Sequence, residues 1–254
     1  MNEEFRVLRQ KILNSNSTDE KIQHLAGAGD CRLMILTGCG PALKHIDQEK
    51  LLKQASMDKA IIVAVKESLS WWTAADARPD FHLTSSYVSQ HVSYPEDCLP
   101  ICIYLLQGSQ IPQNNAIVDI PLHIVRGPKG LKYQDICISH TKEFDKWKFS
   151  VRTLREFGPT IVPTVAFYLA EHLKISTLLT LGVDFTGLLH YYQDEDDTRL
   201  LNPPTKAGSL AEQNLFIRAA DDWWNWLHEN GIDWYRMETE VKTNLPMIPQ
   251  MKYV

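Results

Sequence analysis

Cys31-Arg-Leu-Met-Ile-Leu-Thr-Gly-Cys-Gly-Pro-Ala-Leu43 joins a short apolar segment directly to a pair of glycines. The apolar part, residues 31–36, predicts a buried β-strand. Gly38 and Gly40 follow at once, and glycines there allow a tight turn and a close approach of the backbone to a ligand. A strand that runs through glycines into a helix is typical of the first unit of a parallel α/β sheet.

Further strands and helices follow in the same rhythm. Apolar segments predict strands at residues 60–65, 81–84, 100–105, 116–120, 136–138, 177–182 and 232–235. Helical patterns lie at residues 48–54 and 163–173, and a third runs from 209 to about 231. We therefore predict an α/β fold in a single domain, with a mainly parallel sheet flanked by helices.

The first thirty residues have a different character. Phe5, Leu8 and Ile12 recur at helical spacing, and Ser17 with Glu20 has the spacing of a capping box for a second helix. No internal repeat or linker divides the rest of the chain. We expect an N-terminal helical extension at residues 1–30 and one domain at residues 31–254.

The composition limits the ligand and the class of protein. Hydrophobic residues make up 44% of the 254 residues, which excludes disordered, collagen-like and low-complexity chains. Lys and Arg number 26 against 31 Asp and Glu, a net charge of -5. This balance carries no electrostatic footprint for duplex nucleic acid. We expect any anionic ligand to be small.

The cysteines and the N-terminus point inside the cell. Five cysteines, an odd number, favour buried thiols over a secreted disulfide framework, and no second Cys/His pair completes a zinc site. Met1-Asn-Glu-Glu-Phe5 lacks the pattern of a signal peptide, and no apolar run approaches the ~20 residues that span a bilayer. We expect a cytoplasmic protein without a transmembrane segment. The sequence leaves open whether it forms an oligomer.

The glycine loop is the first candidate binding site. Gly38-Cys39-Gly40-Pro41 leads into a predicted helix whose N-terminal N–H groups would face a phosphate. It forms two thirds of a dinucleotide fingerprint, with Leu43 where the third glycine would stand. The alternative is a tight strand-to-helix turn that binds nothing.

The ends of the next two strands bear on the choice of nucleotide. A NAD site usually has an acidic residue after the second strand, but this chain has Lys66 followed by Glu67. Lys66 disfavours NAD and leaves open NADP, another nucleotide phosphate, or a solvated lysine without a ligand. Ser85 ends the third strand. Trp71-Trp72 flanks the same edge and is a candidate for stacking on a ligand.

The second candidate site follows the strand at residues 177–182. Asp184 lies at the carboxyl end of that strand, and His190, Tyr191 and Tyr192 come soon after it. Histidine transfers protons near neutral pH, and tyrosine hydroxyls donate to a departing phosphate. The alternative is that these rings only pack. The acidic run at residues 194–197 is either a cation site or a solvated loop.

Together these loops resemble a known family. Ile35-Leu-Thr-Gly-Cys-Gly-Pro-Ala-Leu-Lys-His-Ile-Asp47 resembles the opening of the bacterial lipooligosaccharide sialyltransferases, and Leu179-Thr-Leu-Gly-Val-Asp-Phe185 is similar to their Ser-Gly-Ile-Asp-Phe stretch. The same two motifs mark a wider superfamily with relatives of archaeal pterin pyrophosphokinases and some Kdo transferases. The resemblance covers residues 32–85 and 158–192.

The resemblance implies that residues 31–254 form a single Rossmann-like domain of the glycosyltransferase-A-like variant. It implies that this domain binds a nucleotide-activated sugar, usually CMP-linked, without an obligatory metal or other cofactor. It implies that the glycine loop cradles the nucleotide and that tyrosines after the second motif steady the leaving phosphate. Asp184 matches the family's aspartate. The chain departs from the family at Cys39, Lys66 and Thr84-Ser85, where the sialyltransferases have asparagines. In the family a later histidine acts as the base, but this chain has no histidine between Tyr192 and Trp223.

We therefore expect a glycosyltransferase that modifies a glycan or a small-molecule acceptor. The expected catalytic roles are His190 as base, Tyr191 or Tyr192 on the phosphate, and Asp184 orienting them or acting directly. The donor would contact residues of the first three strand ends: Gly38, Cys39, Gly40, Pro41, Leu43, Lys66 and Ser85. Two alternatives stay open, a Mg²⁺-dependent pyrophosphokinase-like enzyme with residues 194–197 as ligands, and a non-catalytic protein that binds nucleotide or sugar.

Overall fold

A computed structural model gives the structure of the chain. It describes residues 3–30, 32–85, 99–105, 118–122, 161–184, 217, 220–221, 223–245 and 247–254. Within these ranges no helix has the length and apolar character needed to cross a membrane.

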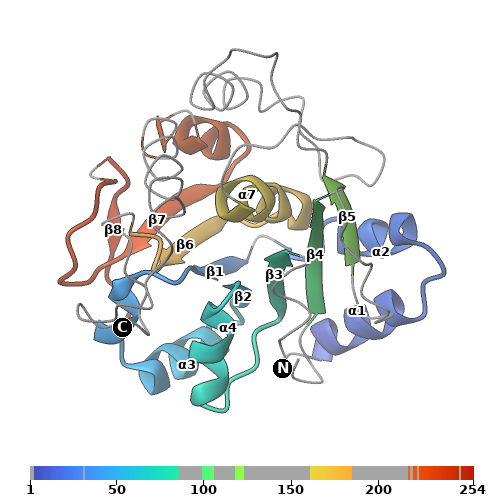
Figure 1. Cartoon of the computed structure of the whole chain (residues 1–254), viewed down its shortest axis with the longest axis horizontal. Coiled ribbons are helices and arrows are strands. Elements are labelled where there is room, and N and C mark those ends of the chain that lie inside the picture. The colour runs from blue at the N-terminus through green and yellow to red at the C-terminus, as the bar shows by residue number, and fades with distance from the viewer. Residues whose placement is uncertain are drawn as a thin grey trace.

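The described strands form one eight-stranded sheet in the order β5-β4-β3-β2-β1-β6-β7-β8 (Figure 1). They are β1 (Leu33–Thr37), β2 (Ile61–Val65), β3 (Phe81–Ser85), β4 (Leu99–Leu105), β5 (Val118–Leu122), β6 (Thr177–Leu181), β7 (Asp233–Met237) and β8 (Gln250–Met251). Each neighbouring pair is parallel. The predicted α/β fold with a mainly parallel sheet in a single Rossmann-like domain is confirmed.

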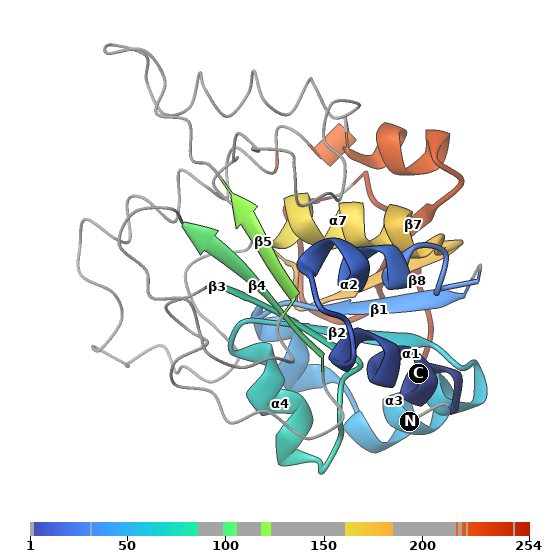
Figure 2. The same cartoon turned by 90° about the vertical axis from the view of Figure 1, so that its right-hand side faces the viewer.

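Helices cover both faces of this sheet (Figures 1 and 2). They are α1 (Glu3–Leu13), α2 (Thr18–Leu25), the 3₁₀ helix η1 (Pro41–His45), α3 (Gln48–Met57), α4 (Ser68–Ala74) and α7 (Ile161–Leu173). Residues 223–229 are also helical. The predicted strand at residues 136–138 lies outside the described residues.

Alternate residues of the central strands enter two separate hydrophobic cores. Met34 and Leu36 of β1 pack with α1, α2 and α7, while Ile35 between them packs with η1, α3 and α4. All five residues of β2 are buried, as expected for a parallel strand covered on both faces. This double burial explains why the strands appear in the sequence as continuous apolar runs.

The two N-terminal helices share the first of these cores. Phe5 lies edge-to-face on Phe81 of β3, with ring centroids 5.1 Å apart. Ser17 caps α2 by accepting a hydrogen bond from the N–H of Glu20 at 3.2 Å, and Glu20 accepts one from the N–H of Asn16 at 2.8 Å. The predicted N-cap at Ser17 is confirmed, while Glu20 bonds back to Asn16 instead of Ser17.

The Trp71-Trp72 prediction is wrong. Trp72 is fully buried and Trp71 is 9% exposed, both in the core beneath α4. The Trp72 indole donates to the Thr37 hydroxyl at 2.8 Å, and Ser68 donates to the Thr37 carbonyl oxygen at 2.9 Å. These rings therefore hold α4 against β1 and do not stack on a ligand.

The order in which successive strands are added to the sheet reverses between β1 and β6. Strands β2 to β5 extend to one side of β1, and β6 to β8 extend to the other. In open α/β sheets, ligands bind beyond the carboxyl ends of the strands at such a switch point. The loops that follow β1 and β6 therefore frame the expected site.

Candidate functional site

The loops after β1 and β6 are in direct contact. The N–H of Gly38 donates to the carbonyl oxygen of Leu181 at 2.8 Å, and the N–H of Gly40 donates to that of Gly182 at 2.7 Å. The two sequence motifs that carry the family resemblance thus form one loop pair at the switch point. We call these residues, 38–43 and 182–184, the switch-point loops.

The contact between these loops requires glycine at two positions. A Cβ at Gly38 would lie 2.4 Å from the carbonyl oxygen of Gly182. A Cβ at Gly40 would lie 2.5 Å from Asp184 Oδ2 and 2.7 Å from the same carbonyl oxygen. All three distances are too short for a real Cβ, so protein packing already accounts for the two glycines.

Asp184 links the two loops through its side chain and its backbone. Oδ2 accepts a hydrogen bond from the N–H of Ala42 at 3.0 Å. The backbone oxygen accepts from the Thr243 hydroxyl at 3.1 Å and from the N–H of Asn244 at 3.3 Å. Burial raises the pKa of the Asp184 carboxyl, and the Ala42 hydrogen bond and Arg236 oppose that rise.

The glycine loop has protein partners where a phosphate was expected. It donates four backbone N–H groups to protein acceptors, those of Gly38, Gly40, Ala42 and Leu43. The helix that follows is a single 3₁₀ segment of five residues with Pro41 at its start, and the Leu43 side chain is buried in the core. Binding of a phosphate by this loop stays a prediction, and it would require displacement of Asp184 or a position beside it.

Cys39 faces the end of β2. Its Sγ lies 3.5 Å from the carbonyl oxygen of Val65 and 3.7 Å from Glu67 Oε2. Burial and the Glu67 carboxylate raise the pKa of the Cys39 thiol to about 12. The thiol is therefore protonated at neutral pH, and it acts as a weak donor from the loop after β1 to the end of β2.

Lys66 makes the turn that brings Glu67 to this position. Its φ is +50°, a left-handed conformation at the end of β2. Its N–H donates to the carbonyl oxygen of Leu83 at 2.9 Å, and its own oxygen lies 2.8 Å from His82 Nε2. Burial lowers the pKa of His82 to about 4, so this ring is neutral and donates from Nε2. A ligand role for the Lys66 side chain stays a prediction.

Several predicted residues cannot be placed at this edge. Ser85 is the last residue of β3, and its backbone pairs with Ile103 of β4. The structure describes this backbone but not the Ser85 side chain. His190, Tyr191, Tyr192 and the acidic run at residues 194–197 lie outside the described residues. Their roles as base, phosphate donors and metal ligands stay predictions.

Arg236 is a residue that the sequence analysis missed. It lies near the carboxyl end of β7, paired with Thr180 of β6, and its Nε donates to the carbonyl oxygen of Ile248 at 3.2 Å. Beside it is an open cavity of about 440 Å³. This cavity, which we call the Arg236 cavity, is lined by Arg236, Val241, Lys242, Thr243, Ile248, Pro249 and Gln250.

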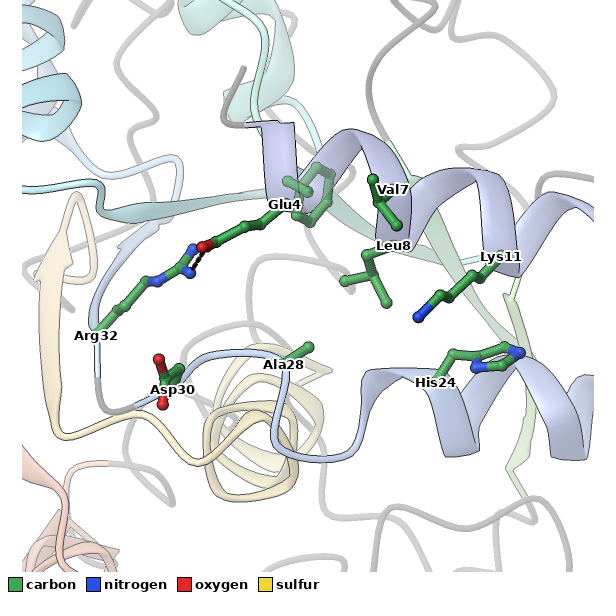
Figure 3. A pocket seen from close by; sticks show the side chains of 9 residues that line it. Glu4, Val7, Leu8, Lys11, His24, Ala28, Asp30 and Arg32 are labelled. Atoms are coloured by element: carbon green, nitrogen blue, oxygen red, sulfur yellow. Dashed lines mark hydrogen bonds and ion pairs between the residues drawn. The ribbon is translucent and has the colours of Figure 1, made fainter.

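A second cavity, of about 340 Å³, lies between α1 and α2 (Figure 3). Lys11 and His24 stand at one end, and the ion pair of Glu4 with Arg32 stands at the other. Arg32 directly precedes β1, so this cavity lies at the amino edge of the sheet. It is therefore separate from the switch-point loops at the carboxyl edge.

Comparison with family models and with curated proteins adds no relative. No protein-family model matches the chain, and no curated protein matches it. Within the described ranges, no three His, Cys, Asp or Glu side chains gather closely enough to hold a metal ion. The candidate site therefore rests on the geometry of the carboxyl edge.

Proposed function

We propose that the chain is a glycosyltransferase that transfers a sugar from a nucleotide-activated donor to a glycan or a small acceptor. The donor that we propose is a CMP-linked sugar. The observation that supports this function is the hydrogen bond of Ala42 N–H to Asp184 Oδ2, because it joins two motifs 142 positions apart at the switch point. These are the motifs that resemble the sialyltransferases, and this is the edge where α/β sheets bind ligands.

The proposed reaction is a direct displacement at the anomeric carbon. The acceptor oxygen attacks that carbon, the bond from the carbon to the phosphate oxygen breaks, and its electron pair leaves with CMP. His190 takes the acceptor proton, and Tyr191 or Tyr192 donates a hydrogen bond to the departing phosphate. Asp184 takes the positioning role in this proposal, since its carboxylate is bonded to Ala42. No metal is required.

Binding without turnover is the second candidate. Four backbone N–H groups of the glycine loop are bonded within the protein. This disfavours a transferase that binds the donor phosphate on this loop, and it therefore favours a binding protein. A Mg²⁺-dependent pyrophosphokinase-like activity is the remaining alternative, with the run at residues 194–197 as ligands.

A thermal-shift panel of CMP, CDP, UDP, ATP and NADP separates these functions. A nucleotide at 100 times its dissociation constant stabilises the folded chain by about 2.7 kcal/mol. The proposal expects the largest shift with CMP. A shift with NADP alone contradicts it. ATP consumption that a chelator abolishes would support the pyrophosphokinase.

A further inference from the structure

Arg236 is a half-buried cation, and most of its hydrogen-bond donors have no acceptor among the described residues. A guanidinium has five N–H donors, and among the described residues only the carbonyl oxygen of Ile248 accepts from this one, at Nε. No carboxylate of the described residues forms an ion pair with it within 4 Å. Burial lowers the pKa of Arg236, and the more distant Asp184 opposes that change. An anion in the adjoining cavity would supply the missing partner.

The walls of the Arg236 cavity suit a phosphate attached to a larger group. Lys242 is exposed and positively charged, and Thr243 and Gln250 add polar side chains. Ile248 and Pro249 provide an apolar wall. The volume of about 440 Å³ lies in the usual range for small-molecule sites. None of the described residues that line the cavity is acidic.

The segment that lines the Arg236 cavity is hydrogen-bonded to the switch-point loops. Thr243 and Asn244 both bond to the backbone oxygen of Asp184. The carboxylate of the same Asp184 fills the start of η1, where the sequence predicted a phosphate. Asp184 therefore occupies the place expected for a phosphate on the glycine loop, and its backbone oxygen bonds to the segment that lines the Arg236 cavity.

We propose that the Arg236 cavity binds the phosphate of the nucleotide, with Arg236 as its main ligand and Lys242 as a second cation. The nucleotide part of this inference rests on the proposed function, whereas the anion site does not. Guanidinium groups bind phosphate through two parallel N–H···O bonds, which a lysine cannot reproduce. When the acceptor oxygen displaces CMP from the anomeric carbon, Arg236 stabilises the charge that develops on the leaving phosphate oxygen.

Titration calorimetry on the full chain tests the inference with three probes: CMP, cytidine and inorganic pyrophosphate. We expect Arg236→Gln to weaken CMP and pyrophosphate at least tenfold and to leave cytidine within twofold. Arg236→Lys should recover only part of the CMP affinity. Lys252→Ala, an exposed lysine just beyond β8, is the matched control and should bind all three probes like the wild type.

The outcomes separate this inference from the proposed function. CMP binding that survives Arg236→Gln within twofold overturns the Arg236 site and leaves the transferase standing. Pyrophosphate binding that depends on Arg236, without any CMP binding, keeps the anion site and contradicts the nucleotide proposal. If Arg236→Gln does not fold, Lys242→Glu on the exposed rim decides: at least fivefold weaker CMP supports the site, and unchanged affinity overturns it. A wild-type chain that binds none of the probes contradicts both.

Discussion

The carboxylate of Asp184 accepts a hydrogen bond from the backbone N–H of Ala42 at 3.0 Å, across 142 residues of sequence. This bond closes the start of η1 and ties the loop after β6 to the loop after β1. An oxygen acceptor at the first turn of a helix typically contributes about 1 kcal/mol. Asp184 is therefore first a structural residue of the switch point, and any catalytic effect passes through the geometry it maintains.

Removing this acceptor should destabilise the fold. We expect Asp184→Ala to lower the free energy of unfolding by about 1–2 kcal/mol, because the N–H of Ala42 loses its partner. Asp184→Asn should cost less, since an amide oxygen can accept the same bond and the buried charge is gone. Urea denaturation measures both. Equal stability of Asp184→Ala and the wild type would contradict the capping role.

A methyl group at Gly38 should be more damaging than one at a glycine with free space. The added Cβ would lie 2.4 Å from the Gly182 oxygen, so the two loops must separate, at a cost of about 1–3 kcal/mol. Gly27 is the matched control, because its φ is +73° but nothing lies within 4 Å of the added atom. Gly27→Ala should cost about 1 kcal/mol from backbone strain alone. Thermal unfolding of both variants would contradict the packing role of Gly38 if Gly38→Ala were the milder change.

Asp80 should make stability depend on pH. Its carboxylate accepts a hydrogen bond from the N–H of Ile62 at 2.8 Å, yet burial raises its pKa from 3.8 to about 6. Between pH 4 and 6 the folded chain then binds more protons at this site than the unfolded chain, so Asp80 lowers stability as pH rises. The change amounts to at most about 3 kcal/mol.

His82 acts in the opposite direction over a similar range. Its pKa falls from 6.5 to about 4 on folding, so the unfolded chain binds more protons and stability rises with pH from 4 to 6.5. We expect the two effects to offset in the wild type and Asp80→Asn to expose the rise. Denaturation at pH 4 and at pH 6.5 measures it. If the stability difference between Asp80→Asn and the wild type were the same at both values, the raised pKa of Asp80 would be wrong.

Cys39 should react slowly with alkylating reagents. With a pKa of about 12 instead of 9.0, the thiolate fraction at pH 8 falls about 1,000-fold. Peptide mapping after iodoacetamide treatment of the native chain should show slow labelling of Cys39, and Glu67→Gln should speed it by removing the nearby charge. Labelling at the rate of the urea-unfolded chain would contradict the raised pKa of the Cys39 thiol.

The strands could be predicted because both faces of the sheet are covered. β1, β2 and β6 are buried on both sides, so each appears as a continuous apolar run. β8 has only two residues, Gln250 and Met251, and such a segment has no pattern to detect. Its place in the sheet depends on pairing with β7, which is a tertiary contact.

The candidate site was only partly predictable, since its main contacts are distant in sequence. Gly38 and Gly40 were singled out for a ligand, whereas the atoms that exclude their side chains belong to Gly182 and Asp184. Arg236 directly follows the predicted last strand, so the rule used for Lys66 and Asp184 would also have found it. Trp72 shows the opposite limit, because its buried bond to Thr37 has no local signal.

Release of CMP from a CMP-linked sialic acid tests the central proposal most directly. We predict acceptor-dependent release by the wild-type chain, a loss of at least 100-fold in His190→Ala and of at least tenfold in Asp184→Ala. His228→Ala, an exposed histidine at the far end of the last described helix, should be unchanged. Rates of both His190→Ala and Asp184→Ala within about threefold of the wild type, or no release at all, would contradict the proposed transferase.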